Sequence, residues 1–135
     1  MRIVGLGNDL VDIRRIEKTL KRHGERFINR VFSETEIDYC KSGGNVHANF
    51  AKRFAAKEAC AKALGTGFAH GVYWKDMCVE NNEFGRPQLI LSGGAEQRLG
   101  ELIPTGMRAQ VDLTITDEFP LAQAIVIVTA LRDGE

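Results

Sequence analysis

The segment that decides the architecture of this chain runs from Arg53 to Gly67 and reads RFAAKEACAKALGTG. Alanine recurs through it, and alanine is the strongest helix former, so the segment predicts the second half of a helix over about 47–64. Glycine ends helices because it adopts the left-handed conformation at no steric cost, which places the end at Gly65. One carboxylate, Glu58, lies among the cations of this helix, and its surroundings decide what the helix does.

The whole chain fits a single domain spanning 1–135, because its 135 residues are 44% hydrophobic and can build one core. No apolar run approaches the roughly 20 residues that a membrane helix needs, and the first residues lack a signal-peptide cleavage site. The cysteines are three in number and share no short spacing (Cys40, Cys60 and Cys78). We therefore expect reduced thiols and a cytoplasmic protein, without contact with a membrane.

The remaining elements are predicted from periodicity, capping residues and turn residues. A strand is expected over 2–9, then a helix capped by Asp12 that Gly24 breaks or ends, and a helix to about 41 whose capping box starts at Ser33. A hairpin of strands over 74–79 and 88–91, a helix over 92–102, and strands over 109–116 and 121–131 follow. This order predicts an α+β fold, an antiparallel sheet with helices packed on one face. The last two strands are the most apolar and are expected in its middle.

Two acidic residues are candidates for chemistry. Asp9 ends a strand whose glycines, Gly5 and Gly7, allow another backbone or a ligand to come close. Glu58 lies four residues before Lys62, and the plainer interpretation is a surface ion pair between them. If Asp9 and Glu58 instead meet across the strand–helix contact, their charges repel unless a cation lies between them. Such a pair suits Mg²⁺, which binds one or two carboxylates together with water and phosphate oxygens.

Several cations near Glu58 could hold phosphate groups. Lys62 and Arg53 are the candidates, and Gly65 and Thr66 at the helix end would let a ligand chain pass closely. Arg53 and Glu58 project about 140° apart around a helix, so a single ligand reaches both only if it wraps the helix.

A basic segment over 14–30 contains seven cations and two glutamates, which gives +7 − 2 = +5. Its cations are Arg14, Arg15, Lys18, Lys21, Arg22, Arg26 and Arg30. Either this is a solvated helix face or it binds an acidic partner. Nucleic acid is not expected, because the whole chain has a pI of about 6.8 and shows no aromatic stacking platform.

Four motifs together resemble one family: 5–9 (GLGND), 13–16 (IRRI), the RFAAKEACAKALGTG helix and 85–87 (GRP). The chain is similar over nearly its whole length to the holo-[acyl-carrier-protein] synthases, the short single-domain group of 4′-phosphopantetheinyl transferases. This resemblance implies a magnesium-dependent transfer of the phosphopantetheine arm of coenzyme A to a serine of apo acyl carrier protein. The reaction releases adenosine 3′,5′-bisphosphate and supports fatty acid biosynthesis.

The resemblance also implies roles for individual residues. Asp9 and Glu58 would hold magnesium and, with Lys62 on the diphosphate, would form the catalytic group. Among the residues that contact coenzyme A, Arg53 would lie near the 3′-phosphate, and the pocket would be lined by Gly65, Thr66 and Pro87. The serine proton would pass to Glu58 or to a metal-bound water.

The same resemblance implies a binding partner for the basic segment over 14–30. Members of the family bind the acidic carrier protein with arginines of this helix, which correspond here to Arg14, Arg15, Arg22 and Arg26. They usually form homotrimers with active sites between subunits. This chain departs from the pattern at Asp112, where relatives often carry histidine, so a contact made by that histidine is not expected here.

A different class of function fits the same residues. A non-catalytic protein could use the basic helix to bind a nucleotide or an acidic protein partner, and it would need no magnesium. The carrier protein, the choice of Mg²⁺ or Mn²⁺ and the acceptance of acyl-coenzyme A are all left open by these residues.

Overall fold

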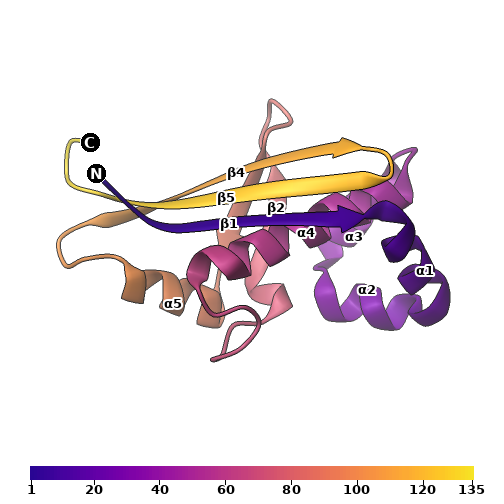
Figure 1. Cartoon of the computed structure of the whole chain (residues 1–135), viewed down its shortest axis with the longest axis horizontal. Helices are drawn as coiled ribbons and strands as arrows, with labels where there is room; N and C mark the ends of the chain where they lie inside the picture. The colour runs from indigo at the N-terminus through magenta and orange to yellow at the C-terminus, as the bar shows by residue number, and fades with distance from the viewer.

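The main sheet is built around the last strand of the chain. The computed structural model describes residues 1–135, and in it β5 (Leu121–Leu131) pairs with β1 (Arg2–Asp12) and with β4 (Arg108–Glu118), antiparallel in both cases. The two ends of the chain therefore lie together, and the amino group of Met1 is 2.8 Å from the Glu135 carboxylate (Figure 1).

The expectation that both of the last strands lie in the middle of the sheet is half wrong. β5 is central, but β4 is an edge strand of the three-stranded sheet. The reason lies in composition: β5 (LAQAIVIVTAL) contains no charged residue and can be covered on both sides, whereas β4 contains Asp112, Asp117 and Glu118.

The helices gather on one face of this sheet, as the α+β prediction requires (Figure 1). They are α1 (Ile13–His23), α2 (Glu25–Val31), α3 (Glu34–Ser42), α4 (Val46–Leu64) and α5 (Gly93–Leu102). A second, two-stranded sheet consists of β2 (Met77–Asn81) and β3 (Pro87–Leu91). The capping box of Ser33 and Glu36 starts α3, and Gly65 ends α4 in the left-handed conformation, so both predicted boundaries are confirmed.

Two strand boundaries differ from prediction by three residues, and the others by two or fewer. β2 starts at Met77 rather than at Trp74, because Trp74–Asp76 forms a 3₁₀ turn in which the Asp76 carboxylate accepts a hydrogen bond from the Tyr73 amide. β1 continues beyond Asp9 to Asp12, because its pairing with β5 extends as far as Leu121. Asp9 therefore lies within the strand rather than at its end.

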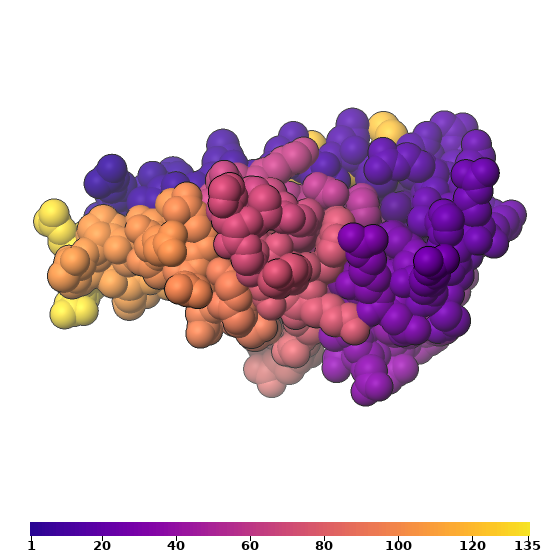
Figure 2. All heavy atoms as spheres, turned by 90° about the horizontal axis from the view of Figure 1, so that it is seen from below, coloured from indigo at the N-terminus to yellow at the C-terminus, as the bar shows by residue number.

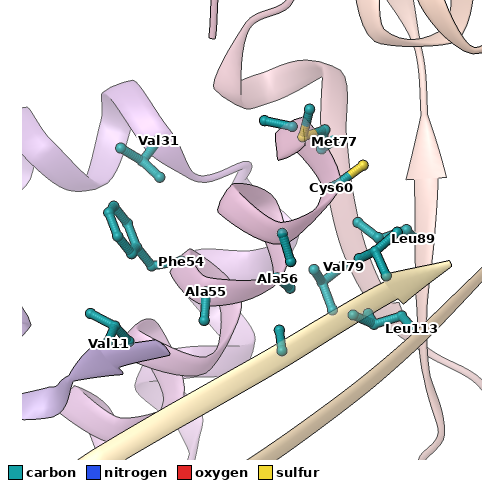
Figure 3. Close-up of a cluster of buried hydrophobic side chains, with 14 of the residues drawn as sticks. Val11, Val31, Phe54, Ala55, Ala56, Cys60, Met77, Val79, Leu89 and Leu113 are labelled. Atoms are coloured by element: carbon teal, nitrogen blue, oxygen red, sulfur yellow. The ribbon is translucent and has the colours of Figure 1, made fainter. Parts of the chain in front are cut away.

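Helix α4 is the centre of the core. It packs against β1 and β5 on one side and against α1, α3 and β2 on the others. Figure 3 shows side chains of α4, among them Ala55 and Ala56, lying between Val11 of β1 and Val79 of β2. A helix enclosed in this way is apolar around most of its circumference, which explains why alanine fills it.

The contact between α4 and β1 is unusually close because glycine lies at the crossing. A Cβ atom at Gly7 would fall 1.8 Å from the Ala59 carbonyl oxygen, and one at Gly5 would fall 2.2 Å from that of Ala63. No side chain fits in this space. The backbone of β1 thus rests directly on α4, and the residues that follow Gly7 are held against the helix.

Candidate active site

Asp9 and Lys62 meet where β1 crosses α4. The Lys62 ammonium donates hydrogen bonds to Asp9 Oδ1 at 3.1 Å and to the Asn8 carbonyl at 3.0 Å. The Asp9 side chain is 14% exposed and that of Lys62 is 52% exposed, so the pair lies at the rim of the crossing. Lys62 therefore pairs with Asp9 across the two elements, and the ion pair within the helix between Glu58 and Lys62 does not form.

Glu58 shares this neighbourhood. Its partial burial raises its pKa, and the negative charge of Asp9 raises it further, whereas Lys62 and Arg15 act in the opposite direction. A carboxylate whose pKa is raised by a second carboxylate is a group that a divalent cation would relieve. The structure thus places Lys62 in contact with Asp9, and Glu58 near enough for the charges of both to act on its pKa.

The donors at this point fit magnesium. There is no cluster of three or more histidine, cysteine or acidic side chains anywhere in the chain, as a closed transition-metal site would require. Two carboxylates at a partly exposed position match the coordination preference of Mg²⁺, which keeps several waters and takes its other ligands from substrate phosphates. Asp9 and Glu58 are the residues of this chain that suit such an ion.

Lys57, next to Glu58, projects about 100° away from it around the helix and is fully buried. Its ammonium lies 2.7 Å from Glu36 Oε1 and donates to the carbonyls of Val31 at 2.7 Å and Trp74 at 3.2 Å. Burial lowers the pKa of Lys57, and the charge of Glu36 opposes that shift. From the sequence, Lys57 could be a support, a ligand contact or a solvated cation, although a lysine among buried alanines signals an internal partner.

Arg53 does not join the Asp9–Glu58–Lys62 group. Its guanidinium lies 3.8 Å from the centre of the Tyr39 ring and donates to Asn81 Oδ1 at 3.0 Å, and the residue is only 4% exposed. Asn81 pairs with Pro87 across the β2–β3 sheet, so Arg53 and Pro87 lie near the same end of that hairpin. This buried guanidinium also has an Nε atom without a hydrogen-bond partner.

The residues expected to contact coenzyme A divide between two cavities. Gly65 and Thr66 line one of about 400 Å³, which is closed on its other side by α5. Pro87 lines another of about 220 Å³, together with Arg86 and Asp112. Sequence reasoning missed Arg98 of α5 in the first cavity, whose Nε donates to the Leu64 carbonyl at 2.9 Å.

Asp112 makes no hydrogen bond or ion pair with the Asp9–Glu58–Lys62 group. Its carboxylate accepts a hydrogen bond of 2.8 Å from the side-chain amide of Gln110, so an uncharged neighbour is its partner. The residue belongs to the second cavity, beside Pro87. This chain therefore offers a negative charge at the position where the sequence resemblance led us to look for histidine.

The basic residues of α1 and α2 differ in whether they form an ion pair within the chain. Arg14 is held by Asp12, with Nη2 at 2.7 Å from Oδ2 and Nε at 3.0 Å from Oδ1, and this contact lowers the pKa of Asp12 to about 2. Arg15, Arg22 and Arg26 are exposed and form no ion pair within the chain. Figure 2 shows these helices, in indigo and violet, at one end of the face that lies opposite the sheet.

None of the helices has both the length and the apolar character needed to span a membrane. Comparison with known proteins then identifies relatives. Residues 5–122 match the family model of the 4′-phosphopantetheinyl transferase superfamily. A holo-[acyl-carrier-protein] synthase of Sinorhizobium fredii is 60% identical over 129 residues, which cover 96% of this chain and 93% of that protein.

Solved structures show the same fold. The holo-[acyl-carrier-protein] synthase of Neisseria meningitidis superposes with a TM-score of 0.82 at 32% identity, covering 94% of this chain and 98% of that one. That of Helicobacter pylori, solved in complex with coenzyme A, gives a TM-score of 0.78 at 30% identity and covers 92% and 99%. By motif, fold and sequence identity, the chain belongs to the 4′-phosphopantetheinyl transferase superfamily.

Proposed function

We propose that this chain transfers the 4′-phosphopantetheine arm of coenzyme A to a serine of apo acyl carrier protein and releases adenosine 3′,5′-bisphosphate. The observation that carries the proposal is the meeting of Asp9, Glu58 and Lys62 at the β1–α4 crossing, in a chain 60% identical to a holo-[acyl-carrier-protein] synthase. The nucleophile belongs to the carrier protein, so the enzyme needs positioning and charge neutralisation more than a nucleophile of its own.

Asp9 and Glu58 would hold Mg²⁺. When bound, the ion would neutralise charge on the diphosphate and polarise the phosphorus that the carrier serine attacks. The chain's own task is to fix the two carboxylates, which the glycine contact between β1 and α4 achieves. In the metal-free chain burial raises the pKa of Glu58, and the serine proton would pass to Glu58 or to a metal-bound water.

Lys62 supplies the second positive charge. Its side chain is half exposed and its ammonium already lies beside Asp9, so it can reach a phosphate oxygen at the same point. Two cationic groups on one diphosphate stabilise the charge of the leaving group more than either does alone. Gly65 and Thr66, one turn further along, support the proposal that coenzyme A runs from Lys62 into the larger cavity.

We propose further that three copies assemble and share each active site. Arg53 and Pro87 lie on the β2–β3 side of α4, away from the Asp9–Glu58–Lys62 group of the same chain. One coenzyme A can contact both sets if they come from neighbouring copies. The outer face of the main sheet supports this, because Leu6, Leu10 and Leu121 expose 66%, 57% and 41% of their surface there.

The carrier protein would dock on the basic helices. Arg15, Arg22 and Arg26 are free to meet acidic side chains, and Arg14 adds to the patch once its bond to Asp12 is shared. Such charges mainly steer the encounter and set the partner's register. With a carrier of fatty acid synthesis as acceptor, and with free cysteines throughout, we place the reaction in cytoplasmic fatty acid biosynthesis.

Mass spectrometry tests the proposal directly. Purified protein, Mg²⁺, coenzyme A and apo acyl carrier protein are expected to yield a carrier heavier by one phosphopantetheine arm, and a chelator is expected to stop the reaction. A protein that binds coenzyme A or carrier equally well with chelator, and modifies none of several carriers, is instead the non-catalytic binding protein.

A further inference from the structure

A buried ion pair includes Lys57, the residue that precedes the proposed metal ligand Glu58 on α4. Lys57 and Glu36 both have fully buried side chains, and their charged atoms are 2.7 Å apart. Both carboxylate oxygens of Glu36 also accept hydrogen bonds from backbone amides. Oε1 accepts one from the Ser33 amide and Oε2 one from the Val79 amide, each at 3.0 Å. The proposed reaction uses neither residue.

This pair connects α4 to several other segments of the chain. Lys57 contacts the end of α2 at Val31 and the 3₁₀ turn at Trp74, while Glu36 belongs to the first turn of α3 and holds β2 at Val79. Ion-pair and hydrogen-bond geometry is directional, whereas apolar contact is not. The network therefore fixes the rotation of α4 about its axis at one particular residue.

Glu58 follows Lys57 directly and projects about 100° further around the helix. On that other side, the Gly7 backbone rests on the Ala59 carbonyl and holds β1 with Asp9. The helix is thus held from two directions, and rotation at Lys57 would carry Glu58 away from Asp9. A metal site needs its ligands placed to within a fraction of an ångström.

We propose that Lys57 and Glu36 are a positioning pair that orients Glu58 toward Asp9 for metal binding, an inference that rests on the proposed function. Stability alone does not account for the pair, because well-packed apolar residues of similar volume generally replace a buried ion pair without loss. The pair gives α4 one defined orientation. Removing both of its charges is therefore expected to weaken metal binding in a protein that still folds.

The test compares Mn²⁺ binding by metal-free wild type and the pair variant Lys57→Met/Glu36→Gln, followed by electron paramagnetic resonance at a temperature where both are folded. The pair variant buries no lone charge, and the glutamine side chain that replaces Glu36 keeps one oxygen acceptor, for either the Ser33 or the Val79 amide. Loss of residues that orient metal ligands typically weakens affinity about 10–100-fold, and we expect the dissociation constant for Mn²⁺ to rise by that factor.

A second readout separates positioning from a general structural role. The Mg²⁺ concentration that gives half-maximal transfer is expected to rise by the same factor, and excess Mg²⁺ is expected to restore turnover. The matched control is Lys52→Met, which removes a lysine of the same helix whose contact, 3.8 Å from Asp117, lies away from the metal ligands. This control is expected to leave Mn²⁺ affinity unchanged.

If the pair variant does not fold, Glu36→Asp provides the same test, because it keeps both charges and withdraws the carboxylate by one methylene. A folded pair variant, or a folded Glu36→Asp, that binds Mn²⁺ as tightly as wild type overturns the positioning role and leaves the proposed function intact. Wild type that binds no Mn²⁺ overturns the metal assignment of Asp9 and Glu58 itself, and the positioning role with it.

Discussion

Gly7 lies against the Ala59 carbonyl so closely that a methyl group on Gly7 would fall 1.8 Å from that oxygen. Asp9 is two residues beyond Gly7 on the same face of β1, and Glu58 is the residue before Ala59 on α4. The missing side chain of a glycine therefore sets the separation between the two acidic residues of the site. It also allows Lys62 to span the crossing and bond to Asp9.

The first prediction concerns this contact. Gly7→Ala is expected to push β1 away from α4, to lower the free energy of unfolding by at least the roughly 1–3 kcal/mol typical of overpacking, and to abolish transfer. Urea denaturation and the carrier assay measure the two effects. Gly100→Ala is the matched control: it lies within α5 with nothing within 4 Å, and is expected to stabilise by roughly 0.5–1 kcal/mol. Equal stability and equal transfer activity of the two variants would show that the close contact at Gly7 is not required.

The second prediction uses the raised pKa of Glu58. In the metal-free protein the folded state holds the Glu58 proton more tightly than the unfolded state does. The ionised carboxylate therefore costs stability at neutral pH, and this cost disappears as the pH falls through the folded-state pKa toward the unfolded value. Glu58→Gln is expected to raise the melting temperature at pH 7 in the presence of chelator while eliminating transfer and Mn²⁺ binding.

Calorimetry between pH 5 and pH 8 with chelator checks the sign. The stability gap between Glu58→Gln and wild type is expected to narrow as the pH falls. A variant that is less stable than wild type at pH 7 would mean that Glu58 stabilises the fold as an ordinary ion-pair partner. Asp9→Asn serves as the companion variant, because it leaves the burial of Glu58 and removes the charge that raises the Glu58 pKa further.

The third prediction concerns stability at Lys57. Lys57→Met alone leaves the Glu36 carboxylate buried without its partner, and breaking a buried pair in this way typically costs about 3–5 kcal/mol. Lys52→Met breaks a contact whose two side chains are 28% and 38% exposed, so about 0–1 kcal/mol is expected. Urea denaturation distinguishes the two lysines, and similar losses for both would show that the Lys57–Glu36 pair is not buried as described.

The fourth prediction separates two adjacent arginines. Arg15 is free, whereas Arg14 is already neutralised by Asp12. Arg15→Ala is expected to raise the KM for carrier protein several-fold, with kcat little changed, and to reduce the dependence of KM on salt. Arg14→Ala is expected to have a smaller effect. Steady-state kinetics at two ionic strengths measures both, and a larger effect at Arg14 would overturn this assignment of the docking surface.

The fifth prediction tests whether active sites are shared between copies. Glu58→Gln and Arg53→Met each disable a different half of the proposed site, and the methionine side chain that replaces Arg53 retains apolar contact with Tyr39. If subunits mix at random, roughly a quarter of the sites in an equal mixture combine two intact halves and regain activity. Mixing by denaturation and joint refolding, followed by the transfer assay, detects this recovery. An inactive mixture of properly assembled subunits would place both halves in one chain.

Local chemistry explains which parts of the fold were predictable. The ends of α3 and α4 depend on residues next to each other in sequence, namely the Ser33–Glu36 capping box and Gly65, and both were predicted correctly. The start of β2 was placed too early because the strand-forming residue Trp74 belongs to a 3₁₀ turn, which depends on the Asp76 side chain. The edge position of β4 was missed because hydrophobicity ranks strands but does not order them.

The proposed site likewise has residues that could be predicted from the sequence and contacts that could not. Asp9, Glu58 and Lys62 were predicted from their motifs, and in the structure Lys62 bonds to Asp9 while the charges of both act on the pKa of Glu58. The partner of Lys62 was not predicted, because the helix spacing favours Glu58 while the actual partner is 53 residues away. The burial of Lys57 depends on Glu36, which belongs to another helix. Spacing within one helix cannot give contacts of this kind, since they exist only once the helices have packed.

The strand order has a consequence for how the protein folds during its synthesis. β1 pairs within the sheet with β5 alone, so that Asp9 lies opposite Ala124, a residue translated long after it. A nascent chain emerging from the ribosome can form its helices early, but its first strand must wait for the last one before the sheet closes. The two acidic residues of the proposed site are therefore assembled late in synthesis, and a chain interrupted before Leu121 would contain Asp9, Glu58 and Lys62 but lack the strand that pairs with Asp9.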